Sequence, residues 1–122
     1  MRNFQEVVNL FEFYGDIGPG VFVETQDLTE PNPLLRGIPI VGYVLIYGQV
    51  YSSQTALVEV MQGTIDNGPT FVYDWIVNFN VLAGITMPRE IPVEGKYAKV
   101  RITNTSVNPA IIRGYFNVRS YE

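Results

Sequence analysis

The sequence contains no cysteine and no histidine. Disulfide bonds, thiolate nucleophiles and the usual zinc sites are therefore excluded. The commonest general base near neutral pH is also missing, so an enzyme with this sequence would depend on carboxylates, Lys, Tyr or Ser alone. We expect no catalytic residue, no metal and no other cofactor.

Long apolar runs are also absent. No stretch approaches the roughly 20 apolar residues that a membrane-spanning helix needs, and the N-terminus lacks the basic-then-apolar layout of a secretory signal. The sequence thus predicts no membrane segment and no export. Its 122 residues are 47% hydrophobic and 13% aromatic, which is typical of one folded domain.

Positive charge is scarce in most of the chain, which has a net charge of −4. Residues 1–88 hold two basic and nine acidic groups, a net of −7, whereas residues 89–122 hold six basic and three acidic groups, a net of +3. Such an asymmetry concerns partners and association rather than fold.

The first 39 residues are difficult to assign. Apolar residues between positions 4 and 14 recur at helical spacing, but aromatic residues in LFEFY also alternate with period two, which favours a strand. A third alternative is an extended arm that orders against a neighbouring subunit. A connection rich in Gly, Pro and acidic residues follows. We interpret residues 1–39 as an N-terminal arm or short helix plus this connection.

From residue 40 the pattern is β throughout. Segments such as IVGYVLIYGQVY, TALVEVMQG, FVYDWIVNFNV, YAKVRIT and AIIRGYFNVRS are separated by turn residues, among them the pair Asn67-Gly68. Strands at this spacing, with no confident helix, predict an all-β fold: a single antiparallel β-sandwich with its core in residues 40–122.

The last two predicted strands each alternate between apolar and polar residues. If NTSVNP turns the chain back as a hairpin, the register that unites the two apolar faces pairs Ile102 with Ile112 and sets Arg101 opposite Arg113. Like charges in that position are unfavourable unless an anionic group lies over them. The predicted electrostatic interface consists of Lys99, Arg101, Arg113 and Arg119.

Three interpretations of this basic face remain open. Nucleic-acid binding is disfavoured by the net negative charge. A solvated strand face that discourages edge pairing is a second interpretation. The third is an interface with the acidic part of another copy, which would weaken as salt rises.

Other candidate chemical roles compete with structural ones. Glu59 and Asp74 are candidate carboxylates for a glycosidase, but nothing in the sequence brings them together. Exposed aromatic residues can form a sugar-stacking platform, although Trp and Tyr more often pack at the core margin. The candidates for such a platform are Tyr73 and Trp75, with Tyr47 and Tyr51 as further aromatics.

A family resemblance covers residues 40–120. The order GYVLIYGQVY, ALVEVMQGTIDNGPTFVYDW and GKYAKVRITNTSVNPAIIRGYFNV resembles small jelly-roll, discoidin-like β-sandwich proteins that are common among phage and virus structural components. The resemblance implies a jelly-roll type of sandwich and a non-enzymatic part of the virion, assembled in the host cytoplasm: a capsid decoration, minor capsid or tail-associated protein. The implied partners are other copies and other virion proteins, and a carbohydrate-binding or receptor-binding module is the alternative function.

Overall fold

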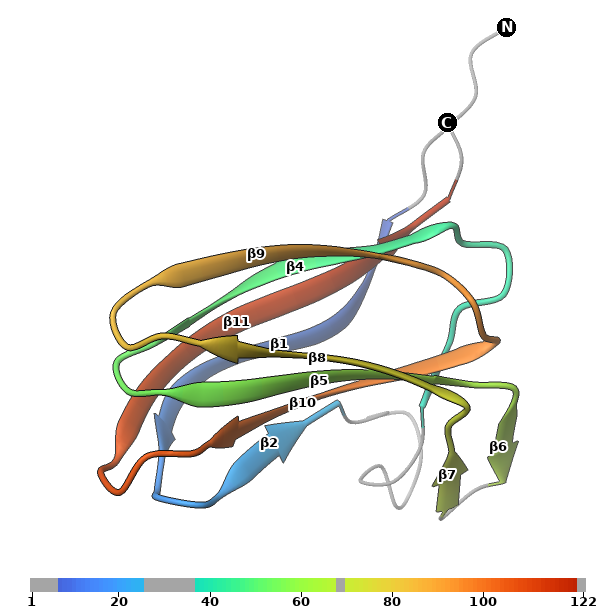
Figure 1. Ribbon diagram of the computed structural model, residues 1–122. Coiled ribbons are helices and arrows are strands. Elements are labelled where there is room, and N and C mark those ends of the chain that lie inside the picture. Colours follow the sequence, from blue (N-terminus) through green and yellow to red (C-terminus); the bar gives the residue numbers. More distant parts are fainter. Residues whose placement is uncertain (1–6, 26–36, 68–69, 121–122) are drawn as a thin grey trace, which may run out of the picture.

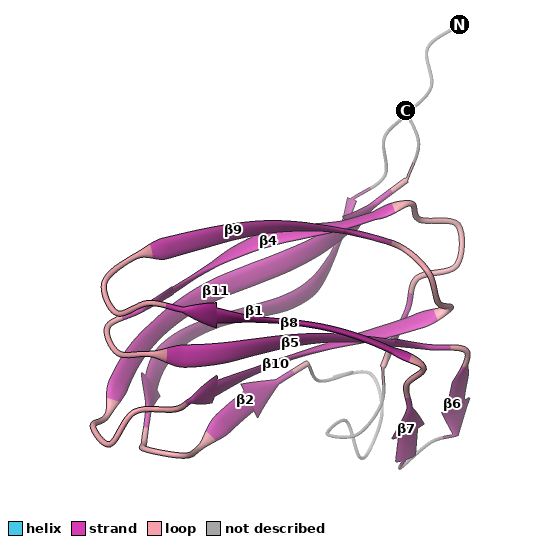
Figure 2. Cartoon of the chain, viewed as in Figure 1, coloured by secondary structure: helices cyan, strands magenta, loops and turns pink. Residues whose placement is uncertain are grey.

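The computed structural model describes residues 7–25, 37–67 and 70–120 (Figure 1). Within these residues all regular secondary structure is β, and no membrane-spanning helix occurs there (Figure 2). The strands are β1 (Val7–Ile17), β2 (Phe22–Glu24), β3 (Ile38–Pro39), β4 (Leu45–Ser52), β5 (Ala56–Gly63), β6 (Ile65–Asn67), β7 (Thr70–Val72), β8 (Trp75–Val81), β9 (Thr86–Pro92), β10 (Tyr97–Asn104) and β11 (Ala110–Arg119).

Two antiparallel sheets pack face to face, as predicted for a β-sandwich (Figure 1). Sheet A has the order β1-β11-β4-β9, and sheet B has the order β2-β10-β5-β8, with β3 also paired to β10. The pairs are nested along the chain: β1 with β11, β2 with β10, β4 with β9 and β5 with β8. Strands β6 and β7 form a separate small ribbon on either side of residues 68–69, so Gly68 of the predicted turn lies outside the described residues.

The alternation in the last two strands places their apolar residues inside. In β11, Ile112, Phe116 and Val118 are fully buried, while Arg113 and Tyr115 between them are exposed. Strand β4 buries alternate residues in the same way, whereas β10 also buries Lys99 and β5 buries every residue from Val60 to Gly63. The core therefore lies between the two sheets, and the odd-numbered residues of β11 from Ile111 to Arg119 point to the outer face of sheet A.

The predicted hairpin between the last two strands is wrong. Strand β10 lies in sheet B, where Ile102 is opposite Val58, and β11 lies in sheet A, where Ile112 is opposite Ser52. The two apolar faces meet across the core instead: a Cβ on Gly114 would lie 3.3 Å from Cδ1 of Ile102. The alternation requires only that the two apolar faces meet. Two strands that face each other across the core from different sheets meet this requirement as well as two strands that are hydrogen-bonded neighbours in one sheet.

Residues 7–17 form a strand, and the alternative of a helix is not seen in this described part of the N-terminal segment. Strand β1 pairs with β11 along its length, with a bulge between Asn9 and Phe11 that buries both Leu10 and Phe11. Aromatic and β-branched residues thus took the conformation that their propensity favours. Strands β1, β2 and β3, all within the first 39 residues, lie in the same two sheets as the later strands.

Sheet A depends on a glycine beneath its outer face. Gly48 of β4 lies opposite Phe116 of β11, whose side chain is fully buried. A Cβ on Gly48 would lie 2.8 Å from the Cα of Phe116 and even closer to the carbonyl oxygen of Tyr115. Only glycine leaves room for this close approach between β4 and β11.

Candidate functional site

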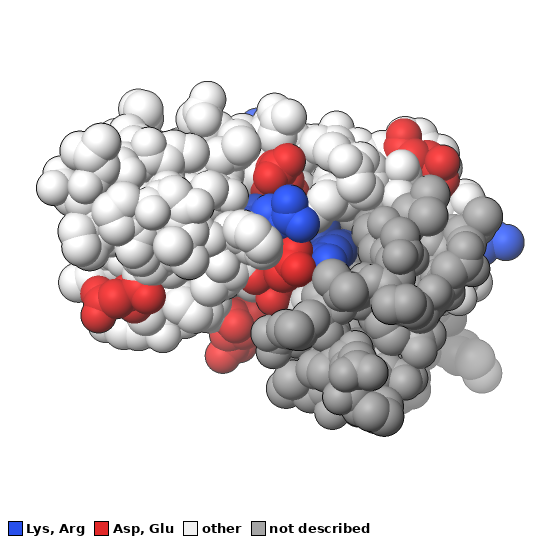
Figure 3. Space-filling model, turned by 90° about the horizontal axis from the view of Figure 1, so that it is seen from below, with Lys and Arg blue, Asp and Glu red and all other residues white. Residues whose placement is uncertain are grey.

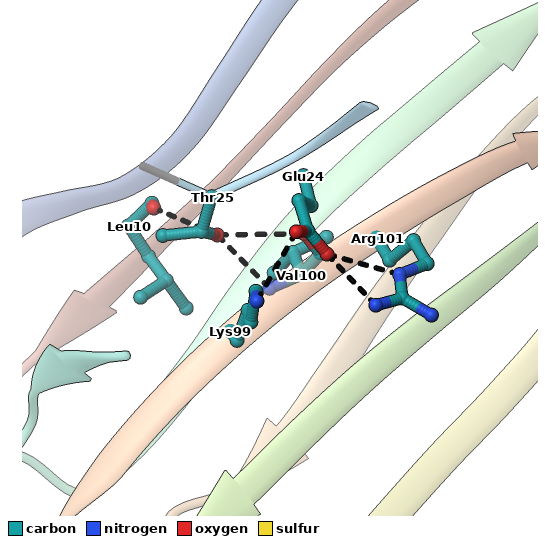
Figure 4. A network of polar contacts seen from close by, with 6 residues as sticks. All are labelled: Leu10, Glu24, Thr25, Lys99, Val100 and Arg101. Atoms are coloured by element: carbon teal, nitrogen blue, oxygen red, sulfur yellow. Dashed lines mark hydrogen bonds and ion pairs between the residues drawn. The ribbon is translucent and has the colours of Figure 1, made fainter. Parts of the chain in front are cut away.

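Two of the predicted interface cations bind a carboxylate of their own chain. Nζ of Lys99 lies 3.2 Å from Oε1 of Glu24, and Nη2 of Arg101 lies 2.9 Å from Oε2 of the same side chain (Figure 4). Nε of Arg101 also donates a hydrogen bond to Oε2 at 3.0 Å. Lys99 is only 4% exposed although it belongs to the polar face of β10. We call Glu24, Lys99 and Arg101 the clamp.

The clamp fastens the short strand β2 to β10. Glu24 lies opposite Arg101 in the register, and the guanidinium of Arg101 lies 4.5 Å from the centre of the Phe22 ring. The neighbouring Thr25 receives a hydrogen bond from the backbone N–H of Val100 at 2.9 Å and donates one to the carbonyl of Leu10 (Figure 4). This network connects β1, β2 and β10, so its first role is structural.

Arg101 and Arg113 do not face each other, which corrects the predicted basic face. Arg101 is on the outer face of sheet B, between Glu24 on β2 and Glu59 on β5. Arg113 is on the outer face of sheet A, on the opposite side of the sandwich. Figure 3 accordingly shows basic and acidic side chains side by side in the middle of the view rather than a continuous basic surface.

Arg113 and Arg119 share the outer face of sheet A. The guanidinium of Arg113 lies 4.7 Å from the centre of the Tyr51 ring on β4. Arg119 is partly exposed and lies opposite Leu45 on β4 and Val7 on β1. Within the described part of the chain, neither arginine forms an ion pair.

A shallow pocket of about 430 Å³ opens on this face above the centre of sheet A. The strand registers arrange its outward side chains in rows that cross β1, β11, β4 and β9. One row contains Tyr14, Arg113, Tyr51 and Thr86, the next contains Glu12, Tyr115 and Gln49, and the third contains Asn9 and Asn117. We call this hollow the face pocket.

The polar groups of the face pocket have hydrogen-bonding capacity to spare. Among the described residues, the guanidinium of Arg113, the carboxylate of Glu12 and the amide of Gln49 form no hydrogen bond or ion pair with one another or with other side chains. The exception in the lining is Asn9, whose Nδ2 donates to Oδ1 of Asn117 at 3.0 Å. The pocket thus offers donors, acceptors and tyrosine rings to a ligand.

The predicted aromatic platform is divided between different surroundings. Trp75 lines a second hollow, of about 580 Å³, between β8 and β9, the edge strands of sheet B and sheet A. Tyr73 does not line this hollow. Between them, Asp74 accepts hydrogen bonds from the N–H and hydroxyl of Thr64. Gln62, the buried amide in this hollow, is already bonded to the backbone of residues 92, 94 and 95.

One end of the sandwich presents mainly apolar side chains, with the exposed Asp16 on β1 opposite Ile111 as the charge beside them. Residues 18–21, 53–55, 82–85 and 105–109 form the four loops at the end seen on the left in Figure 1, and none of these residues is charged. The space-filling view shows few charged atoms towards this end (Figure 3). Five large apolar residues, each between 47% and 87% exposed, make up what we call the apolar end: Val21, Leu82, Ile85, Val107 and Ile111.

Hydrogen bonds fix the loops of the apolar end. The N–H of Gly84 donates to the carbonyl of Ser52 at 2.8 Å, and that of Gly20 donates to the carbonyl of Asn104 at 2.9 Å. The side chain of Asn104 is fully buried and bonds to the carbonyls of Ile17 and Asn108. A surface held in this way loses little conformational entropy when a partner binds.

Neither chemistry nor comparison assigns the chain to a known family. A metal site usually needs at least three ligand side chains, and among the residues that the structure describes no group of three acidic side chains is arranged to hold a metal ion. Glu59 faces Asn78 on sheet B, whereas Asp74 directly precedes the start of β8. No protein-family model matches the chain, and no curated protein matches its sequence.

The sequence interpretation missed several residues of the face pocket. Glu12, Tyr14 and Gln49 were not singled out, and Tyr51 was considered only as one of several aromatics. Their signal is the same period of two that defines the strands: positions 12 and 14, and positions 47, 49 and 51, all fall on one face of a strand. Recognising it requires β1 to be taken as a strand.

Proposed function

We propose that the sandwich is of the jelly-roll type. A jelly roll is a double sheet of eight strands made of two Greek keys, equivalent to a long antiparallel hairpin that is rolled up. The nested pairs support this, because the pairs β1·β11, β2·β10, β4·β9 and β5·β8 fall alternately in sheet A and sheet B. Viral capsid domains and lectins both use this type of fold.

We further propose that the protein is a non-enzymatic structural component of a virus or phage particle. It acts as a capsid decoration, minor capsid or tail-associated protein, and it is added to the particle in the host cytoplasm. The resemblance of residues 40–120 and the nested strand order support the particle as its location. Fold likeness does not determine function, so the contact surface has to be argued from the residues themselves.

The apolar end carries the proposal of assembly. Its exposed apolar side chains on rigid loops are typical of a protein–protein contact. The occupant is a second copy of the chain, because copies with a net charge of −4 repel each other in general, and at this end, whose four loops carry no charge, they approach with few like charges opposed. Association driven by apolar contact is not screened by salt.

Mass measurement in solution tests this proposal. We expect a concentration-dependent dimer that persists as NaCl rises from about 0.1 M to about 1 M, over which the Debye length falls from about 10 Å to about 3 Å. The paired change Leu82→Asp and Val107→Asp should abolish the dimer. The matched control is Val41→Asp, because Val41 is 68% exposed but lies between β3 and β4, away from the loop end.

Two outcomes would count against the proposed assembly. One is a monomer at every protein concentration, and the other is a dimer that dissociates as salt rises, which would restore an electrostatic contact. The location in a particle is tested separately with an antiserum against the chain. Immunogold labelling of purified particles from the source should mark the capsid or the tail, and unlabelled particles would refute the proposed location.

A further inference from the structure

We propose that the face pocket binds a neutral oligosaccharide, with Arg113 and Tyr51 at the centre of the site. This inference goes beyond the role in assembly and uses a different surface: the face pocket lies on the outside of sheet A, and the apolar end lies on the loops. Its volume of about 430 Å³ is within the range of about 300–1,000 Å³ that is usual for small-ligand sites.

The charges of the pocket favour a ligand without net charge. Arg113 contributes one positive charge, and Glu12, one row away on β1, contributes one negative charge. An anionic ligand that gains from Arg113 is opposed by Glu12, and a cationic ligand meets the reverse situation. A sugar hydroxyl both donates and accepts hydrogen bonds, so neighbouring hydroxyls can accept from the guanidinium and donate to the carboxylate at once.

Arg113 is held ready for such a ligand. Its guanidinium carbon lies 4.7 Å from the centre of the Tyr51 ring, a cation–π contact that favours this position of the side chain, and among the described residues nothing else binds its N–H groups. Fixing the donor before binding lowers the entropy that a ligand must remove. Gln49, whose amide is exposed on β4, adds a further donor and acceptor in the next row.

Tyrosine rings supply the apolar part of the site. Tyr14 is 75% exposed, Tyr115 is 37% exposed, and both line the pocket with Tyr51. The face of an aromatic ring is negatively polarised and attracts weakly positive C–H groups, such as those on the flat side of a pyranose ring. A tyrosine as exposed as Tyr14 adds little to the core, so stabilising the fold does not explain its presence.

A peptide or a nucleic acid fits the face pocket less well. The pocket lies over β11 and β4, the inner strands of sheet A, whose backbone groups are already paired on both sides, so a peptide cannot add to the sheet there. Its side-chain lining offers no aliphatic slot for a peptide anchor. A phosphate chain needs several cations along its path, and this pocket has one arginine beside a carboxylate.

A glycan microarray that carries neutral and acidic oligosaccharides tests the inference. The full-length chain should bind neutral members and leave the sialylated and uronate-containing members unbound. Titration with the best neutral member should show affinity lowered about tenfold or more by Arg113→Ala, since a charge-assisted hydrogen bond is lost. Arg113→Lys should recover only part of the affinity, because lysine lacks the planar fork.

Matched variants distinguish this site from the other surfaces. Arg119→Ala, on the same face of β11, and Trp75→Ala, in the second hollow, should leave affinity unchanged. The inference is overturned if no neutral glycan binds, if acidic glycans or an immobilised peptide library bind instead, or if Arg119→Ala weakens binding as much as Arg113→Ala. The apolar-end variant should still bind the glycan as a monomer, so a failure of either proposal leaves the other standing.

Discussion

On the outer face of sheet B, Arg101 lies over the ring of Phe22 and binds the carboxylate of Glu24, whereas on the outer face of sheet A, Arg113 lies over Tyr51 and binds no carboxylate among the described residues. The guanidinium carbons of the two arginines lie at similar distances from the ring centres, 4.5 and 4.7 Å. They differ in whether the N–H groups of the guanidinium have a hydrogen-bond partner. On sheet B the guanidinium of Arg101 donates to Glu24, and on sheet A the guanidinium of Arg113 donates to no other described residue.

This difference separates a structural face from a binding face. Lys99 and Glu24 in the clamp are nearly buried, so the clamp contributes to folding by fastening β2. The side chains of the face pocket are mostly exposed and contribute little to folding, which leaves them available to a ligand. Substitutions on the outer face of sheet B should therefore lower stability, whereas substitutions on the outer face of sheet A should lower binding and leave stability nearly unchanged.

The largest expected effect comes from removing the centre of the clamp. Glu24→Ala takes away the carboxylate that pairs with the buried Lys99, and breaking such a buried ion pair costs about 3 kcal/mol of unfolding free energy. Urea denaturation followed by circular dichroism measures it. Glu12→Ala on the other face is the control and should change stability by no more than about 0.5 kcal/mol. Equal losses in the two variants would remove the distinction between the faces.

The next effect is expected beneath the binding face rather than on it. Gly48→Ala places a methyl group against Tyr115 and Phe116, and overpacking of this kind costs about 2 kcal/mol. Gln49→Ala, the next residue along β4 but pointing outward, should cost less than about 0.5 kcal/mol. If Gly48→Ala were neutral, β4 and β11 would have to move apart easily, and the face pocket would lose its rigid floor.

The two arginines offer a direct comparison of the faces. Arg101→Ala should cost about 1.5 kcal/mol, because it removes a charge-assisted bond and a ring contact from a side chain that is one-third exposed. Arg113→Ala removes only the ring contact and should cost about 0.5 kcal/mol. The same denaturation assay measures both values. A cost for Arg113→Ala as large as that for Arg101→Ala would show that its guanidinium also supports the fold.

Much of the fold, but less of the site, was accessible from the sequence. Period-two alternation in residues 98–102 and 112–118 identified which apolar residues are buried, because it reflects the geometry of a strand. It did not identify partners: the same alternation fits two strands that pair and two strands that face each other across the core. The hairpin between β10 and β11, and with it the basic face, failed for this reason.

The clamp was hidden from the sequence for a related reason. Glu24 is 75 positions before Lys99, and only the crossing of the chain from β1 into β2 brings its carboxylate to β10. Lys99 occupies a polar position in the alternation, so the pattern predicts a solvated lysine, whereas the structure buries it. Charge counts along the chain reveal an asymmetry but not which charges neutralise each other. The face pocket is likewise assembled from four strands whose order the alternation does not contain.

The smallest expected effect is the response of the clamp to salt, and it discriminates most finely between the two faces. Screening by ions acts on exposed charges and much less on nearly buried pairs, so the stability lost in Glu24→Ala should change by less than about 0.5 kcal/mol between about 0.1 M and about 1 M NaCl. Parallel denaturation curves of the wild-type chain and the variant at the two salt concentrations measure it. If the loss disappeared at high salt, the ion pairs of Glu24 would be solvated like any surface pair. Arg101 would then differ from Arg113 only in lying near a carboxylate, that of Glu24. The outer face of sheet B would again be a candidate surface for contact with another protein.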